Sequence, residues 1–87
     1  MVAERHRLEP ALILRQDRRP DVVYARNIAA WLLREKLRLT FEGIGGVLGD
    51  RHHSTVIHSV RLVNQRRFYD RSFNRHLDSL WEEVLSA

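Results

Sequence analysis

A glycine followed by a run of short polar side chains, within residues 49–60, most constrains what this chain can fold into. Gly49 ends a short apolar segment, and Asp50 stands where a new helix would begin. Arg, His, Ser and Thr fill the first turns of that helix, and Val56 and Val60 set its apolar stripe. A short helix, a glycine turn and a longer helix with polar donors at its start are typical of a helix-turn-helix. The backbone N–H groups and positive dipole end of such a helix start attract anions.

Hydrophobic residues recur at helical spacing along almost the whole chain. No period-two alternation, hairpin signal or internal repeat interrupts them, so we expect an all-α fold of about five helices. The expected helices cover residues 3–15 (beginning near Glu9 if Pro10 interrupts the first turns), residues 22–38, a short stretch after Thr40, and residues 51–67 and 70–85.

Cap residues and glycines mark the ends of these helices. Asp21 follows a polar, proline-bearing loop and is the expected N-cap of the second helix, as Thr40 is of the third. Three glycines weaken the third helix and permit close approach of a neighbouring helix: Gly43, Gly45 and Gly46. The expected apolar faces contain Ala25, Ile28, Ala29, Leu32 and Leu33 in the second helix, with Trp31 on a flank, and Phe73, Leu77, Leu80, Trp81, Val84 and Leu85 in the last.

The length and composition indicate one small domain, residues 1–87, with a modest core. The absence of cysteine excludes a disulfide framework and a thiolate metal site. No apolar run is long enough to span a membrane, and the first residues lack the apolar stretch of a signal peptide. We therefore expect a cytoplasmic protein. Because the chain begins with Met1, we expect a stand-alone protein, with an excised domain as the alternative.

The net charge of +4 favours an anionic partner. Lys36 is the only lysine, and the planar guanidinium of the many arginines pairs with phosphates and guanine edges. The codon usage of a high-GC genome would also explain most of this preference for arginine over lysine. Four basic residues late in the chain are expected on a solvated face, with a supplementary phosphate track as the alternative: Arg66, Arg67, Arg71 and Arg75.

No catalytic pattern is visible: the chain has no P-loop and no Ser-His-Asp arrangement in a suitable context. We therefore expect no enzymatic activity and no cofactor. His52, His53 and His58 lie on one expected helix without a carboxylate at ligand spacing, so no metal site is expected. We expect His58 to be a half-buried packing residue.

Residues 26–63 resemble, in register, the DNA-binding C-terminal domain of the bacterial replication initiator DnaA. The segment Arg26-Asn27-Ile28-Ala29 resembles the family's Arg-Gln-aliphatic-Ala, and Arg51-x-His53-Ser54-Thr55-Val56-Ile57-His58 is similar to its Arg-Asp-His-Thr-Thr-Val-Leu-His. The family's helix-turn-helix positions hold Phe41, Ile44, Gly45, Leu48 and Gly49. The resemblance extends more loosely to the end of the chain.

This resemblance implies a set of DNA-binding residues: Arg18, Arg19, Arg26, Thr40, Arg51, His52, His53, Ser54 and Thr55. Arg51 and Thr55 would grip phosphate, whereas His53 and Ser54 would reach base edges in the major groove. Arg18 would reach the minor groove with Arg19 beside it. From the residues alone, other readings stay open: a charged solvent loop for the two arginines, a plain N-cap for Thr40, and a solvated helix start capped by Asp50 for residues 51–55.

Three departures from the family pattern bear on recognition. His52 stands where the family has an acidic residue that can accept a hydrogen bond from cytosine N4, and histidine more readily donates. Leu62 stands where many members have a basic residue, and Glu42 and Gly43 differ from the family's short-helix start.

We therefore expect a monomeric domain that binds double-stranded DNA at an initiator-type box, in replication initiation or its regulation. The domain is expected to bind no nucleotide. Two alternatives stay open: a protein-interaction module on a degenerate helix-turn-helix, which His52 and Leu62 favour, and a transcriptional regulator of a mobile element.

Overall fold

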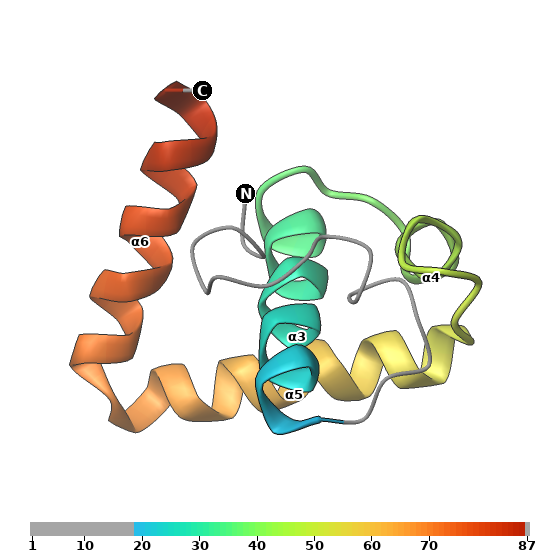
Figure 1. Ribbon diagram of the computed structural model, residues 1–87, viewed down its shortest axis with the longest axis horizontal. Helices are drawn as coiled ribbons and strands as arrows, with labels where there is room; N and C mark the ends of the chain where they lie inside the picture. Colours follow the sequence, from blue (N-terminus) through green and yellow to red (C-terminus); the bar gives the residue numbers. More distant parts are fainter. Residues whose placement is uncertain (1–18, 87) are drawn as a thin grey trace.

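The computed structural model describes residues 19–86, and Figure 1 shows their arrangement. Within this range the chain forms four helices and no strand: α3 (Pro20–Glu35), α4 (Phe41–Val47), α5 (His53–Tyr69) and α6 (Arg71–Ser86). The all-α prediction is confirmed. The expected first helix, residues 3–15, and Arg18 lie outside the described residues.

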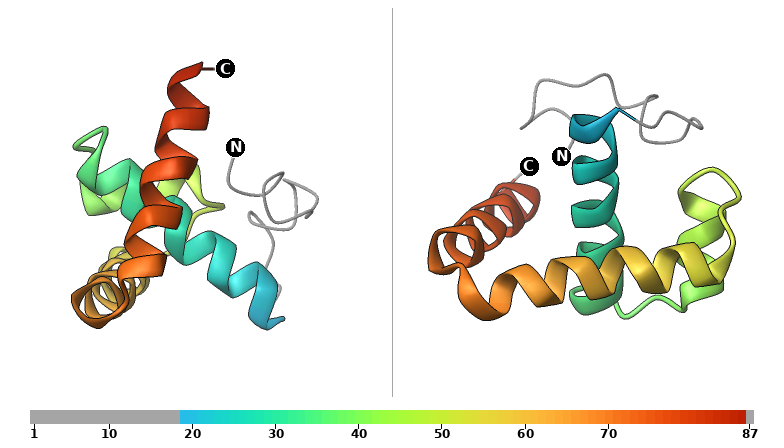
Figure 2. Two further views of the ribbon diagram at one scale, coloured as in Figure 1. Left: turned by 90° about the vertical axis from the view of Figure 1, so that its left-hand side faces the viewer. Right: turned by 90° about the horizontal axis from the view of Figure 1, so that it is seen from below.

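Helices α3 and α5 cross each other and make the main packing contact of the fold. The short helix α4 lies over the first part of α5, and α6 rises from the other end of α5 (Figures 1 and 2). Helix α4, the turn after it and α5 therefore form the expected helix-turn-helix, and α3 packs against both of its helices.

Apolar side chains from all four helices meet in one core. Ile28, Ile44, Leu77 and Leu80 are its largest fully buried members. Trp31, on the flank of the expected face, is 3% exposed, and its indole N–H donates to Asn64 Oδ1 at 3.0 Å. The predicted faces are mostly confirmed: Ala25, Leu32 and Phe73 are buried, and Ala29, Leu33 and Trp81 pack partly buried against the core.

The end of α6 departs from the expected apolar face. Val84 is only half-buried, and Leu85 is 66% exposed. Helical spacing places both residues on the same stripe as Leu77 and Leu80, but the stripe extends beyond the core that the other helices provide. The prediction that Leu85 belongs to the buried face is therefore wrong.

Helix α3 starts without the side-chain cap that we predicted. Its N-cap is Arg19, and Asp21 lies inside the helix, where its Oδ1 accepts only the N–H of the next residue, at 3.0 Å. Pro20 occupies the first helical position, where a missing N–H costs nothing. At the other end the helix stops at Glu35, earlier than expected, and Arg38 adopts a left-handed φ of 57° that turns the chain toward α4.

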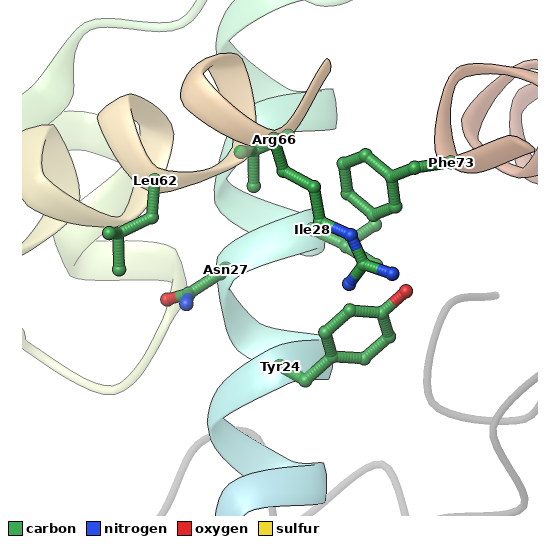
Figure 3. Close-up of a pocket in the computed structure, with 7 residues that line it drawn as sticks. Tyr24, Asn27, Ile28, Leu62, Arg66 and Phe73 are labelled. Atoms are coloured by element: carbon green, nitrogen blue, oxygen red, sulfur yellow. The ribbon is translucent and has the colours of Figure 1, made fainter. Parts of the chain in front are cut away.

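The corner between α5 and α6 is built from polar residues. Asp70 Oδ1 accepts the backbone N–H of Phe73 at 2.9 Å and so caps α6, while the Asp70 N–H closes α5 on the carbonyl of Arg66 at 3.0 Å. The Arg66 guanidinium lies over the rings of Phe73 and Tyr24, at 4.3 and 5.5 Å from their centres (Figure 3). Arg66 thereby links α3, α5 and α6.

Arg67 reinforces the same corner. Its guanidinium lies 4.7 Å from the centre of the Trp31 ring, and its Nε donates to Asn74 Oδ1 at 2.9 Å. The Asn74 side-chain amide returns a bond to the Arg67 carbonyl at 2.8 Å. The expected solvated face is confirmed for Arg66, which is exposed although aromatic rings lie under its guanidinium, and is wrong for Arg67, which is half-buried against Trp31. Arg71 and Arg75 are exposed.

Candidate nucleic-acid interface

The turn between α4 and α5 folds back onto α4. Gly49 and Asp50 adopt left-handed φ values of 86° and 57°, a conformation that glycine and aspartate tolerate better than most residues. The Arg51 N–H then donates to the Gly45 carbonyl at 2.9 Å. A Cβ on Gly45 would collide with the Arg51 carbonyl oxygen. The glycines were expected to permit close approach of a neighbouring helix, but the close neighbour of Gly45 is the backbone of the turn.

Helix α5 begins at His53 and is capped by His52. The alternative in which Asp50 caps this helix is wrong, because the left-handed backbone of Asp50 differs from the extended conformation that an N-cap requires. His52 has that conformation, with φ −63° and ψ 145°. Its Nδ1 accepts the backbone N–H of Ser54 at 3.1 Å and lies 2.7 Å from the Ser54 hydroxyl oxygen.

The first turn of α5 presents its side chains to solvent. His53, Ser54 and Thr55 are exposed, and no acidic residue occupies this turn. The His53 ring packs against that of His52 with centres 4.1 Å apart. Below them Val56 is fully buried and anchors the backbone of the turn in the core. The exposed polar side chains of residues 53–55 therefore belong to a helix start that is anchored in the core by Val56.

Arg51 lies half-buried between the turn and α5. Removal from water lowers the pKa of its guanidinium, but the ordinary value is so far above neutrality that the side chain stays a cation. The positive dipole end of α5 and the Arg51 charge each favour an anion here, whereas the exposed Asp50 in the same turn opposes one.

Thr40 caps α4, as predicted. Its Oγ1 accepts the Gly43 N–H at 3.0 Å, and the residue is exposed. The neighbouring Arg34 lies 4.1 Å from the centre of the Phe41 ring and donates to the Leu39 carbonyl at 3.0 Å, which fixes the link from α3 to α4. The hydroxyl hydrogen of Thr40 can still be donated outward.

The other predicted site residues come from α3. Arg19 is exposed at its N-cap, and Arg26 lies half-buried along the helix. The beginning of α3 and the beginning of α5 lie apart in every view, so the structure does not bring Arg19 into the group at residues 51–55 (Figures 1 and 2). Arg18 lies outside the described residues.

Within residues 19–86, no group of three or more His, Cys, Asp or Glu side chains is placed to hold a metal ion. His58 is exposed, so its expected role in packing is wrong. Nor does any helix in the described part of the chain have the length and apolar character needed to cross a membrane.

Two contacts that shape this site were not predicted from the sequence. The first is the cap formed by His52, which gives the residue a fixed orientation in addition to its expected place at the interface. The second is the packing of Gly45 against the carbonyl of Arg51. A histidine two residues before a serine and a glycine inside a short helix are the only signals of these contacts, and neither is specific.

Comparison with known proteins agrees with this geometry. Residues 1–63 match the family model described as the bacterial DnaA protein helix-turn-helix. The chain belongs to this family. It is 33% identical over 86 residues to the chromosomal replication initiator protein DnaA of Microcystis aeruginosa and 32% identical over 79 residues to that of Dechloromonas aromatica. These alignments cover 99% and 91% of this chain.

The relatives are much longer proteins. The chain spans 19% of the Microcystis aeruginosa DnaA protein and 17% of the Dechloromonas aromatica DnaA protein. A DnaA protein from Thermomicrobium roseum is 40% identical over 65 residues, which is 75% of this chain and 14% of that relative. The likeness to DnaA therefore concerns the helix-turn-helix domain. Helix α4, the turn and α5 form the helix-turn-helix after which the family is named.

Proposed function

We propose that this domain binds double-stranded DNA at an initiator-type box and acts in replication initiation or its regulation. The observation that carries the proposal is the first turn of α5, where exposed His53, Ser54 and Thr55 stand beside the cation Arg51 with no acidic residue in the turn. The start of a recognition helix is where a helix-turn-helix contacts bases. The relatives' name, chromosomal replication initiator, supports the biological setting.

The proposed residues divide into two groups by chemistry. Arg51 and Thr55, with the backbone N–H groups of the helix start, suit phosphate oxygens, and Thr40 at the start of α4 offers a second backbone contact. His53 and Ser54 suit base edges in the major groove. Arg18 and Arg19 are proposed to reach the adjacent minor groove. Arg26 is carried over from the motif as a DNA-binding residue.

Oligomeric state, location and chemistry complete the proposal. The 87 residues act as one monomeric domain in the cytoplasm and have no enzymatic role. They bind no nucleotide or other cofactor, because the interface needs only side chains and helix-start N–H groups. The net charge of +4 supports binding to a polyanion.

Selection from random duplexes tests this function without assuming the box sequence. The selected duplex is then titrated at several salt concentrations. The logarithm of the affinity should fall linearly with the logarithm of salt, with a slope of about −0.9 for each phosphate contact. A slope near zero, or no binding at low salt, would contradict duplex binding.

A second candidate, a protein-interaction module, is favoured by one observation. An open apolar groove between α4 and α5 is lined by Phe41, Ile57, Val60 and Phe68, and Phe68 is 94% exposed. The variant Phe68→Ser separates the two functions. Phe68→Ser should leave duplex affinity unchanged if the start of α5 binds DNA. If the wild-type protein shows no duplex binding at low salt, the groove remains as the candidate functional surface.

A further inference from the structure

We propose that His52 makes this domain prefer a hydrogen-bond acceptor on the base it faces, the reverse of the preference that an acidic residue would give at this position. The inference rests on the proposed function, because it concerns how the same interface reads DNA. Its source is the cap bond of His52, which fixes which ring nitrogen carries the proton.

The cap bond decides the proton position. His52 Nδ1 lies 3.1 Å from the backbone nitrogen of Ser54, and a backbone N–H can only donate. Nδ1 must therefore accept, so the neutral ring carries its proton on Nε2. The Ser54 hydroxyl, 2.7 Å away, can adopt either role and is free to donate to the same nitrogen. The bond from the rigid backbone sets the tautomer.

The orientation of the ring is fixed together with its tautomer. His52 is exposed, and with Nδ1 engaged by its own helix start, Nε2–H is the polar group left to face a partner. The ring of His53 lies against it, with centres 4.1 Å apart and planes inclined by 32°. His52 thus presents one donor in a defined direction.

A single donor distinguishes base edges in the major groove. Guanine offers acceptors at N7 and O6 and thymine at O4, whereas cytosine offers the amino group at N4, which is itself a donor. An aspartate at the same N-cap would accept the cap bond with one carboxylate oxygen and leave the other as an acceptor, which suits cytosine. The exchange of acid for histidine therefore reverses the outward polarity of the position and keeps the cap.

Two substitutions separate polarity from capping. His52→Asn keeps an acceptor for the cap and an amide donor facing outward, whereas His52→Asp keeps the cap and faces outward with an acceptor. Both residues are favoured N-caps, so neither change should unfold α5. Base preference is a ratio measured within each protein, so the general loss of affinity from the added negative charge of His52→Asp cancels.

The first measurement uses the free protein and needs no DNA. Long-range proton–nitrogen NMR correlations of the histidine rings at pH 8 distinguish a proton on Nε2 from one on Nδ1. We expect a single Nε2–H form for His52, assigned by the loss of its signal in His52→Asn. The exposed His58 on the same helix provides the comparison ring.

The second measurement reads the bases. Random-duplex selection with the wild-type chain defines the site, and each base pair is then replaced by the other three and titrated with all three proteins. At one base pair, the wild type and His52→Asn should prefer guanine or thymine over cytosine by about tenfold, and His52→Asp should reverse that order.

The outcomes distinguish this inference from the proposed function. An Nδ1–H form in the free protein, or one base preference shared by all three proteins that bind duplex, would overturn the inference and leave DNA binding intact. Failure of all three proteins to bind any duplex at low salt would overturn the proposed function and the inference with it.

Discussion

A polar residue starts a helix at each end of α5: His52 caps α5 itself, and Asp70 caps α6 after the corner. At the first end the neighbouring side chains, including His53 and Thr55, lie exposed at the surface. At the second end the neighbouring polar groups bond to one another and to aromatic rings, as Arg67 does with Asn74 and Trp31. The two ends are built from similar residues and leave very different surfaces.

The difference comes from what lies beside each corner. The turn before α5 folds back on Gly45 of the short helix α4, so the first turn of α5 projects from the fold. The corner after α5 lies beside α3, whose Tyr24 ring contacts the Arg66 guanidinium (Figure 3). The Trp31 ring of α3 contacts the Arg67 guanidinium. The polar side chains of residues 53–55 are therefore exposed at the first corner, whereas at the second corner Arg66 and Arg67 lie against aromatic rings, even though both corners are basic in sequence.

The largest expected effect tests the fold of the first corner. Gly45→Ala should lower the free energy of unfolding by about 3 kcal/mol, because its Cβ meets the backbone of Arg51, which cannot move aside as a flexible side chain would. Chemical unfolding monitored by circular dichroism measures the change.

Gly46→Ala is the matched control in the same helix. Nothing lies within 4 Å of a Cβ at Gly46, so alanine should stabilise the domain by about 0.5–1 kcal/mol through its higher helix propensity. Equal stabilities for Gly45→Ala and Gly46→Ala would show that the turn does not depend on the approach of Gly45 to Arg51.

The next effect concerns base reading at the first corner. His53→Ala should weaken binding to the selected duplex by about 1–3 kcal/mol and binding to random DNA much less, because an exposed ring at the start of α5 is proposed to contact a base edge. Competition titrations with both duplexes measure the ratio. Equal losses on the two duplexes would assign His53 to phosphate rather than to a base.

A smaller pair of effects compares arginines from the two corners. Arg51→Ala should weaken binding to selected and random duplexes alike and reduce the magnitude of the salt slope by about 0.9, as expected for one lost phosphate contact. Arg67→Ala should lower the free energy of unfolding by about 1 kcal/mol, because it removes the Trp31 and Asn74 contacts.

Each arginine variant is the control for the other. Salt titrations and thermal unfolding are performed on both proteins. The comparison of the two corners is wrong if Arg67→Ala reduces the salt slope as much as Arg51→Ala does, since Arg67 would then contact DNA as well.

The smallest effect is a pH dependence at the second corner. The Phe73 N–H bond, and then the Arg66 side chain, lower the pKa of the Asp70 carboxyl. A lowered pKa in the folded state stabilises the fold above the ordinary carboxyl range, and that stabilisation is lost as the pH falls through the lowered value. Asp70→Asn should therefore be less stable than the wild type at pH 7, and the gap should close on acidification below about pH 4.

Unfolding of wild type and Asp70→Asn between pH 7 and pH 2 measures this gap. With Arg66→Gln in both proteins, the difference in stability at pH 7 should be smaller but not zero, because the hydrogen bond from the Phe73 N–H to Asp70 remains. A gap that stays constant with pH would contradict a perturbed Asp70.

The sequence predicted the described helices because their apolar spacing reports burial directly. Ile28 and Leu32 in α3, and Leu77 and Leu80 in α6, recur at the helical period and are all buried. The cap of α4 by Thr40 was also predicted, since it depends only on residues within one turn. Helix boundaries were less accurate: α3 was expected to reach Arg38, but the chain turns there through a left-handed backbone and the Leu39 N–H closes the helix on the Leu33 carbonyl at 3.2 Å.

At the site, the residues were predicted better than their roles. The exposed side chains of residues 53–55 follow from their place at a helix start. The alternative reading of this helix start gave the cap to Asp50, however, and the left-handed turn gives it to His52. His58 was expected to pack and is exposed, because the core stripe passes through Val56 and Val60 instead.

The sequence by itself determined the helical class, the helix-turn-helix and the family. The helical class follows from the spacing of apolar residues, and the other two follow from a contiguous motif, so none of them requires knowledge of contacts between distant residues. Only the tertiary structure decided which basic side chains pack against aromatic rings. Arg66 and Arg67 resemble any exposed arginines until α3 and α6 place aromatic rings against them. The tertiary structure likewise decided the orientation of His52, because its cap depends on the backbone direction that the turn imposes.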